Sequence, residues 1–162
     1  MSSVDIFFNI AALGRPKELK DFLALALNRE LINCVNDLGE NALIQCVHGA
    51  HFAADAQALQ RYVTCAEMLI EAGVDINRAD ADARTAVHWA VQLNRRPLLE
   101  VLLNKGAVVD VEDRLGFKPF HLAVQCNAID CISALSTTAN KQVRPVIHNV
   151  CNMRTRQTNF VG

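Results

Sequence analysis

The chain has 162 residues, of which 51% are apolar and 20% charged, a composition typical of one globular domain and not of a disordered chain. The net charge is −1, but the last 32 residues hold four basic and no acidic residues, which leaves −5 in the first 130. Charge this sparse argues against the dense basic face of a nucleic-acid-binding protein, and no run reaches the ~20 apolar residues of a membrane span. We therefore expect no binding to nucleic acid or membrane.

The first half of the chain predicts two helical units. About residues 5–32 form a degenerate first unit, and residues 33–76 form a second unit with an insertion at 49–60. The insertion is Ala-rich, and Asp55 is a candidate N-cap, so one long helix is predicted over residues 55–72. We favour a lengthened helix with a short surface loop. A protrusion that contacts a specific partner is the alternative, because unusually long connections are often functional.

The third unit, residues 77–109, has clear signals for two helices. Thr85 is a candidate N-cap for a helix over 86–93, and Asn94 can adopt the left-handed turn that ends it. Pro97 falls near the start of the next helix, where its missing N–H costs little. Gly106 then ends that helix.

The fourth unit, residues 110–136, repeats the third at an offset of 33 residues, so that Asp80 matches Asp113 and His88 matches His121. The second unit matches the third at an offset of 44, because of its insertion. A single pair of short helices cannot bury both of its faces, so the copies are expected to stack.

Residues 137–162 are predicted to be a C-terminal capping segment and a basic tail. Apolar residues at helical spacing indicate a capping helix from about 141 to 152. Lys141, Arg144, Arg154 and Arg156 are widely spaced and lack interleaved aromatic residues, so solubilising charge is a better interpretation than nucleic-acid contact.

The six cysteines include no C-x-x-C pair, and the N-terminus lacks the features of a secretory signal. Free thiols in a reducing compartment, the cytoplasm or the nucleus, are the expectation, with Cys126 and Cys131 buried.

Cys46, His48 and His51 resemble three metal ligands, but no fourth follows at a standard spacing. No phosphate-binding loop or nucleophile motif occurs. We expect no metal, no cofactor and no enzymatic activity.

The repeated motif resembles that of the ankyrin family, D-x-x-G-x-T-P-L-H-x-A followed by a second helix ending L-L-x-x-G-A. The chain reads D-A-D-A-R-T-A-V-H-W-A from Asp80, D-R-L-G-F-K-P-F-H-L-A from Asp113, and L-L-N-K-G-A over residues 102–107. The second unit departs from the motif, because N-A-L-I-Q-C stands where T-P-L-H-x-A is expected. The resemblance implies an all-α solenoid of helix–turn–helix units with short turn fingers over residues 1–136. It also implies that His88 and His121 brace the turns between units and are not catalytic.

The resemblance further implies that a partner protein binds at the turn tips and along the first helix of each pair. The residues expected to bind it are Leu38, Glu40, Asp82, Arg84, Trp89, Gln92, Leu93, Arg114, Leu115, Phe117 and Gln125. Apolar residues at exposed positions mark interaction sites, and aromatic and Arg side chains often dominate the binding energy. Packing of Trp89 between units, and of Leu115 and Phe117 on a neighbouring turn, is the alternative.

These expectations lead to a monomeric, non-catalytic regulator that docks a folded partner. Small ankyrin proteins resemble regulators of cell-cycle protein kinases, so a kinase or its complex is the partner that we expect. An inhibitor of a transcription factor in the NF-κB manner is one alternative, and the ankyrin segment of a larger scaffold is another. The degenerate first unit and the tail favour a complete chain over a segment.

Overall fold

The computed structural model describes residues 2–25 and 29–138, and all regular secondary structure within them is helical. The helices are α1 (Ser3–Ala12), α2 (Pro16–Leu25), α3 (Arg29–Ile32), α4 (Ala42–Gly49), the 3-10 turn η1 (Ala50–Phe52), α5 (Ala56–Glu71), α6 (Ala86–Gln92), α7 (Arg96–Asn104), α8 (Pro119–Gln125) and α9 (Ile129–Thr138). The all-α expectation is confirmed.

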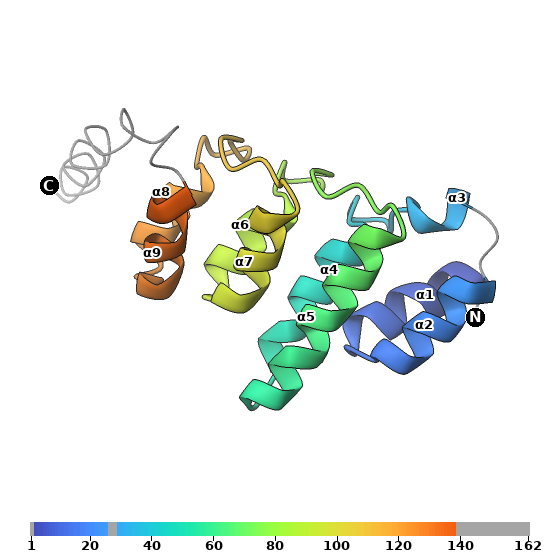
Figure 1. Cartoon of the computed structure of the whole chain (residues 1–162). Coiled ribbons are helices and arrows are strands. Elements are labelled where there is room, and N and C mark those ends of the chain that lie inside the picture. Colours follow the sequence, from blue (N-terminus) through green and yellow to red (C-terminus); the bar gives the residue numbers. More distant parts are fainter. Residues whose placement is uncertain (1, 26–28, 139–162) are drawn as a thin grey trace, which may run out of the picture.

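The helices stack as pairs in two layers. α1, α4, α6 and α8 contact one another in succession and are called the inner helices, and α2, α5, α7 and α9 form the second layer and are called the outer helices. In Figure 1 the pairs lie side by side in one row, and the loops that lead into α4, α6 and α8 gather along one edge. One continuous apolar core runs through the row, because each pair buries against its neighbours the face that it cannot bury alone.

The third unit forms as its local signals predict. Thr85 is the N-cap residue of α6, which ends at Gln92, one residue before the predicted end. Asn94 follows with a φ of 50°, Pro97 is in the first turn of α7, and Gly106 lies just past its end with a φ of 86°. These residues place α6 and α7 so that both bury aliphatic side chains in the core.

The first unit is a true helix pair and joins the second through a very close contact. The Tyr62 hydroxyl of α5 donates a hydrogen bond to the carbonyl oxygen of Ala12 at 3.3 Å. A Cβ atom on Gly49 would lie 1.9 Å from that same oxygen, so only glycine lets α4 approach the end of α1 this closely.

The insertion in the second unit lengthens one helix, as favoured from the sequence. Asp55 caps α5 by accepting a hydrogen bond from the N–H of Ala58 at 2.6 Å. α5 then has 16 residues, against nine in α7, and it extends beyond its neighbours at the edge opposite the loops (Figure 1). The preceding 3-10 turn, η1, exposes Phe52, which is 82% accessible.

The C-terminal segment is described only as far as residue 138. The capping helix predicted at 141–152 and most of the 137–162 tail therefore lie outside the described residues. Among the residues that are described, none of the helices has the length and apolar character needed to cross a membrane.

Candidate functional site

Three turns of the same construction connect the helix pairs, and we call them the fingers: residues 36–40, 80–84 and 113–117. An Asn or Asp at the first position of each finger accepts two backbone hydrogen bonds with one side-chain oxygen. In the first finger, Asn36 Oδ1 accepts from the N–H groups of Leu38 and Glu40, both at 3.0 Å. The fourth residue has a positive φ, 76° at Gly39 and 59° at Ala83. Side chains at the second and third positions therefore project from a fixed turn.

Backbone hydrogen bonds join each fingertip to the next. The N–H of Ala81 donates to the carbonyl of Leu38 at 2.9 Å, and the N–H of Arg114 donates to the carbonyl of Asp82 at 3.0 Å. The tips form a continuous ledge of exposed residues that we call the fingertip row: Asp37, Leu38, Ala81, Asp82, Arg114 and Leu115. This row contains four of the residues expected to bind a partner.

The last residue of each finger turns inward and is less exposed than the residues at the tips. Glu40 is 4% exposed, Arg84 is half-buried in an ion pair, and Phe117 is half-buried against the core. Their N–H groups bond to the side chain at the finger base, which directs their own side chains toward the inner helices. The Glu40 carboxylate is therefore withdrawn from the surface, and Phe117 packs against the core with part of its side chain exposed, so partner binding by these residues stays a prediction.

Glu40 instead joins its finger to α4. Its carboxylate accepts hydrogen bonds from Asn36 Nδ2 at 2.9 Å and from Gln45 Nε2, and lies 3.1 Å from His48 Nδ1. Burial lowers the pKa of His48, although the carboxylates of Glu40 and Asp80 act in the opposite direction. His48 is thus a neutral hydrogen-bonding group of the inner helix near pH 7.

Trp89 lies between two units and is half-buried. Its indole N–H donates to Asp80 Oδ2 at 2.8 Å, and its ring meets the His48 ring edge to face, with centroids 4.2 Å apart. The Arg84 guanidinium carbon lies 5.1 Å from the ring centroid, within the range of a cation–π contact. The structure therefore shows Trp89 packed between units, with part of its ring still accessible.

Arg84 connects the second finger to the third. Its Nε donates to Asp113 Oδ2 at 3.2 Å, and its Nη1 donates to Gln92 Oε1 at 3.2 Å. Burial alone would raise the pKa of Asp113, but hydrogen bonds from the N–H groups of Phe117 and Leu115 and from Arg84 hold it below its ordinary value. Polar and aromatic contacts consequently connect the first finger to the third through His48, Trp89 and Arg84.

The remaining predicted residues lie on the inner helices or, for Leu93, just after one. Gln92 and Gln125 are exposed, whereas Leu93 is half-buried and packs against the core. Cys131 is buried as expected, but Cys126 is exposed, because it follows the last residue of α8 at the open turn between the two helices. The inner helices α4, α6 and α8 contain no Asp, Glu, Lys or Arg.

The two motif histidines make structural contacts. His88 is fully buried, and its Nδ1 accepts from the N–H of Thr85 at 3.1 Å, which places the proton on Nε2. That N–H faces the Phe117 carbonyl of the next finger at 3.2 Å. His121 Nδ1 accepts equally from the N–H of Lys118, but its Nε2 meets no hydrogen-bonding partner among the described residues. His88 therefore bridges two units, as the motif implies.

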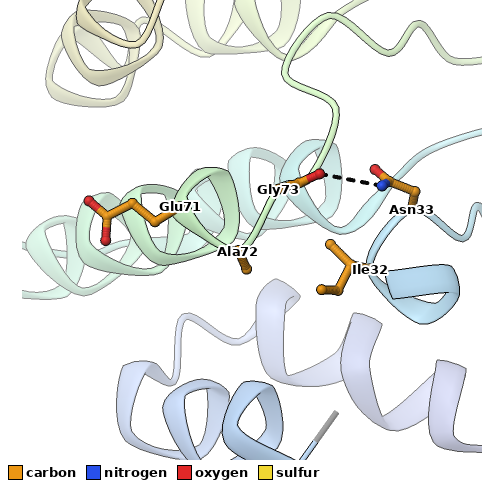
Figure 2. Close-up of a pocket in the computed structure, with 5 residues that line it drawn as sticks. All are labelled: Ile32, Asn33, Glu71, Ala72 and Gly73. Carbon is orange, nitrogen blue, oxygen red and sulfur yellow. Dashed lines mark hydrogen bonds between the residues drawn. The ribbon is translucent and has the colours of Figure 1, made fainter. Parts of the chain in front are cut away.

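A cavity of about 410 Å³ lies between α3 and the C-terminal end of α5. It is lined by Ile32, Asn33, Glu71, Ala72 and Gly73. Figure 2 shows Asn33 bonded across it to the Gly73 carbonyl, at 3.3 Å, with the Glu71 side chain directed away. Glu71 pairs with Lys105 at 3.0 Å. No acid–base pair converges on this cavity, so we do not assign the functional site there.

The three residues spaced like metal ligands make separate contacts. The Cys46 thiol lies 3.5 Å from the Tyr62 carbonyl, His48 faces Glu40, and His51 is exposed beside Phe52. Over residues 2–25 and 29–138, no group of three or more His, Cys, Asp or Glu side chains is placed to hold a metal ion.

Comparison with known proteins identifies the repeat. The family model described as ankyrin repeats (3 copies) matches residues 50–145. Chicken inversin is 32% identical over 111 residues, 68% of this chain but 9% of the relative. Serine/threonine-protein kinase 12 of Arabidopsis thaliana is 38% identical over 80 residues, 49% of this chain and 17% of the relative. Drosophila palmitoyltransferase Hip14 is 41% identical over 58 residues, 35% of this chain and 9% of the relative. The chain thus spans a small part of the length of these relatives.

Proposed function

The chain belongs to the ankyrin-repeat family, a family of protein–protein interaction modules, and from this premise we propose that it is a non-catalytic regulator that docks a folded partner protein on its fingertip row. The observation that carries the proposal is the pair of exposed leucines on this row. Leu38 is 61% exposed and Leu115 is 73% exposed, each at the third position of its finger. Apolar side chains held on an exposed, hydrogen-bonded ledge are typical of an interaction surface.

Rigidity of the row supports the same proposal. The Asx hydrogen bonds at the finger bases and the backbone bonds between tips hold the surface in one conformation before any partner arrives. A pre-organised surface loses little conformational entropy on binding. The side chains behind the row serve the fold, because His48, His88 and His121 all use Nδ1 in internal contacts.

The partner class that we propose is a protein kinase or its complex, in cell-cycle control, in the cytoplasm or the nucleus. An Arabidopsis relative with a similar stretch is itself named a serine/threonine-protein kinase. A transcription factor held in the NF-κB manner is the second candidate. The third candidate is a scaffold role, in which this chain is one segment of a longer protein. The stretches similar to this chain make up only a small share of each relative, as this candidate requires. We propose that the chain itself is monomeric and binds neither nucleic acid nor membrane.

The test is capture from a cell extract with a matched pair of variants. Leu38→Asp with Leu115→Asp places two charges on the fingertip row, and Leu25→Asp with Ile129→Asp places the same two charges on exposed leucine and isoleucine positions of the outer helices. We expect the wild type and the outer-helix variant to capture the same protein, and the fingertip variant to lose it by at least tenfold. Thermal unfolding of all three chains checks that they are equally folded.

The identity of the captured protein decides among the partner classes. A protein kinase or its subunit supports the first, and a transcription factor replaces it with the second. Equal capture by the fingertip variant places the binding site elsewhere. A Phe52→Asp variant then tests whether the loop of the insertion is that site, since this ring is 82% exposed.

A further inference from the structure

The net negative charge of residues 1–138 is concentrated in the three finger segments, which are the fingers together with a few flanking residues. Residues 33–40, 75–84 and 110–118 contain eight acidic and four basic residues, a net charge of −4. Residues 1–138 together carry −5, so the rest of the solenoid is close to neutral. The inner helices next to the fingers add no Asp, Glu, Lys or Arg. A partner that approaches the leucines of the fingertip row therefore enters a negative field.

Two of the four cations in these segments are already paired. Arg84 lies against Asp113 at 3.2 Å. Lys118 Nζ is 2.5 Å from Asp110 and 3.9 Å from Glu112. These cations compensate carboxylates behind the row and leave the carboxylates at its outer edge uncompensated.

The uncompensated carboxylates sit at the first two fingertips. Asp37 and Asp82 are exposed, and no ion pair to either is found among the described residues. Each is beside an apolar tip, because Asp37 precedes Leu38 and the Leu38 carbonyl bonds to the finger that carries Asp82. The third tip differs, since Arg114 precedes Leu115 there. The fingertip row thus has an acidic end, an apolar residue at each end, and a single cation at its far tip.

We propose that the fingertip row recognises a basic segment of the partner protein, with Lys or Arg side chains over Asp37 and Asp82 and apolar side chains against Leu38 and Leu115. The proposal rests on the proposed function and adds the chemistry of the partner. The backbone bonds between the tips hold the two carboxylates at a fixed spacing. The row therefore discriminates between partner segments by the sign and the spacing of their charged side chains. The cation at Arg114 directs the basic end of the segment toward the first two fingers.

The test uses synthetic peptides of about twelve residues with equal leucine content and net charges of about −4, 0 and +4. The single tryptophan, Trp89, lies half-buried behind the second finger, so its fluorescence reports binding near the row. We expect the basic peptide to bind, the acidic peptide not to bind, and the affinity for the basic peptide to fall as salt is raised. Equal binding of all three peptides would overturn the proposal.

Variants of matched charge then locate the contact. Asp37→Asn with Asp82→Asn is expected to weaken binding of the basic peptide about three- to tenfold, and Arg114→Gln to strengthen it about twofold. The control, Asp21→Asn with Asp130→Asn, removes two exposed charges from the outer helices and is expected to leave the affinity unchanged. A loss as large in the control, or a weaker affinity in Arg114→Gln, contradicts the proposal.

Two further outcomes separate this proposal from the proposed function. If a captured partner is lost with Leu38→Asp and Leu115→Asp but kept with Asp37→Asn and Asp82→Asn, docking on the row stands and the basic segment is wrong. If replacing Lys141, Arg144, Arg154 and Arg156 by Gln in the whole chain raises the affinity for the basic peptide at least tenfold, the chain's own tail occupies the row, and a partner's basic segment is not its primary ligand.

Discussion

The units at residues 33–76 and 77–109 fix the start of their inner helices with different side chains. In the later unit Thr85 begins α6, and His88 reaches the Phe117 carbonyl of the next finger at 3.2 Å. In the earlier unit one residue both caps the helix and makes the long-range bond. Asn41 Oδ1 caps α4 by accepting from the N–H of Ile44 at 3.0 Å, and its Nδ2 donates at 2.8 Å to the carbonyl of Asp75, in the segment of the same unit that leads to the next finger. We call this bond the Asn41 bridge. More than one side chain can therefore tie the start of an inner helix to a distant turn.

The two units also differ where their inner helices end. Gly49 ends α4 against the Ala12 carbonyl, whereas the equivalent residue of the later unit is Leu93, which packs against the core. The earlier unit lies against the degenerate first unit, whereas the later unit lies between the second and the fourth units. The residue at the end of each inner helix thus depends on how closely the neighbouring unit approaches it.

The largest effect is expected from Gly49→Ala. Its Cβ would lie 1.9 Å from a backbone oxygen that cannot rotate away, so α1 must separate from α4, at a cost of about 3 to 4 kcal/mol. Gly106→Ala is the control, because no atom lies within 4 Å of its Cβ position, and only the left-handed backbone opposes it, by about 1 to 2 kcal/mol. Urea unfolding measures both, and equal losses would show that the close contact is unimportant.

The next effect is that of His88→Ala, which we expect to cost about 3 kcal/mol. The change leaves a cavity and removes the partner of two polar groups, the Thr85 N–H and the Phe117 carbonyl. His121→Ala is the matched control, since its Nε2 bridges to nothing in the described chain. We expect it to cost at least 1 kcal/mol less. If the control costs as much, the bridge does not distinguish the two histidines.

Asn41→Ala should cost about 2 kcal/mol, from the lost cap and the lost bridge together. Asn41→Ser separates the two contributions, because serine keeps a capping oxygen but is too short to reach the Asp75 carbonyl. We expect serine to recover about half of the loss in the free energy of unfolding. A serine variant as unstable as the alanine variant would assign the whole effect to the bridge.

The smallest effect is a pH dependence of the free energy of unfolding that arises from the histidines. Burial lowers the pKa of His48, His88 and His121, so the folded chain favours neutral rings. The unfolded chain binds protons first as the pH falls through about 6.5, and the stability should therefore decrease between about pH 6.5 and 5 and be constant above that range. Urea midpoints at about pH 7.5 and 5 measure the decrease, which His88→Ala should reduce and Asn41→Ala should not. An unchanged decrease in His88→Ala would remove this histidine as a source.

Much of the fold followed from local signals in the sequence. Thr85, Asn94, Pro97 and Gly106 each have one physical role that depends on near neighbours, and the structure confirms all four. The end of α6 was predicted one residue too late, because Leu93 is apolar but already belongs to the turn.

The site was harder to predict, because burial within a finger depends on contacts across units. Glu40, Arg84 and Phe117 look like tip residues in the sequence but turn inward in the structure. The recurrence of Asn36, Asp80 and Asp113 at the finger bases was a usable signal. An Asn or Asp side-chain oxygen that accepts from the N–H groups two and four residues later fixes the turn. The bridge made by Asn41 has no motif, and only the three-dimensional contact reveals it.

The bonds between fingertips involve only backbone atoms, Ala81 N–H to the Leu38 carbonyl and Arg114 N–H to the Asp82 carbonyl. Side chains at these tips take no part in holding the ledge together, so evolution or a protein engineer can exchange them without loosening it. At these tips the backbone atoms stabilise the ledge, and the side chains are free to determine binding specificity. A library randomised at the six positions of the fingertip row should yield folded chains with new binding preferences, and the amides of Ala81 and Arg114 should exchange slowly with solvent in every member.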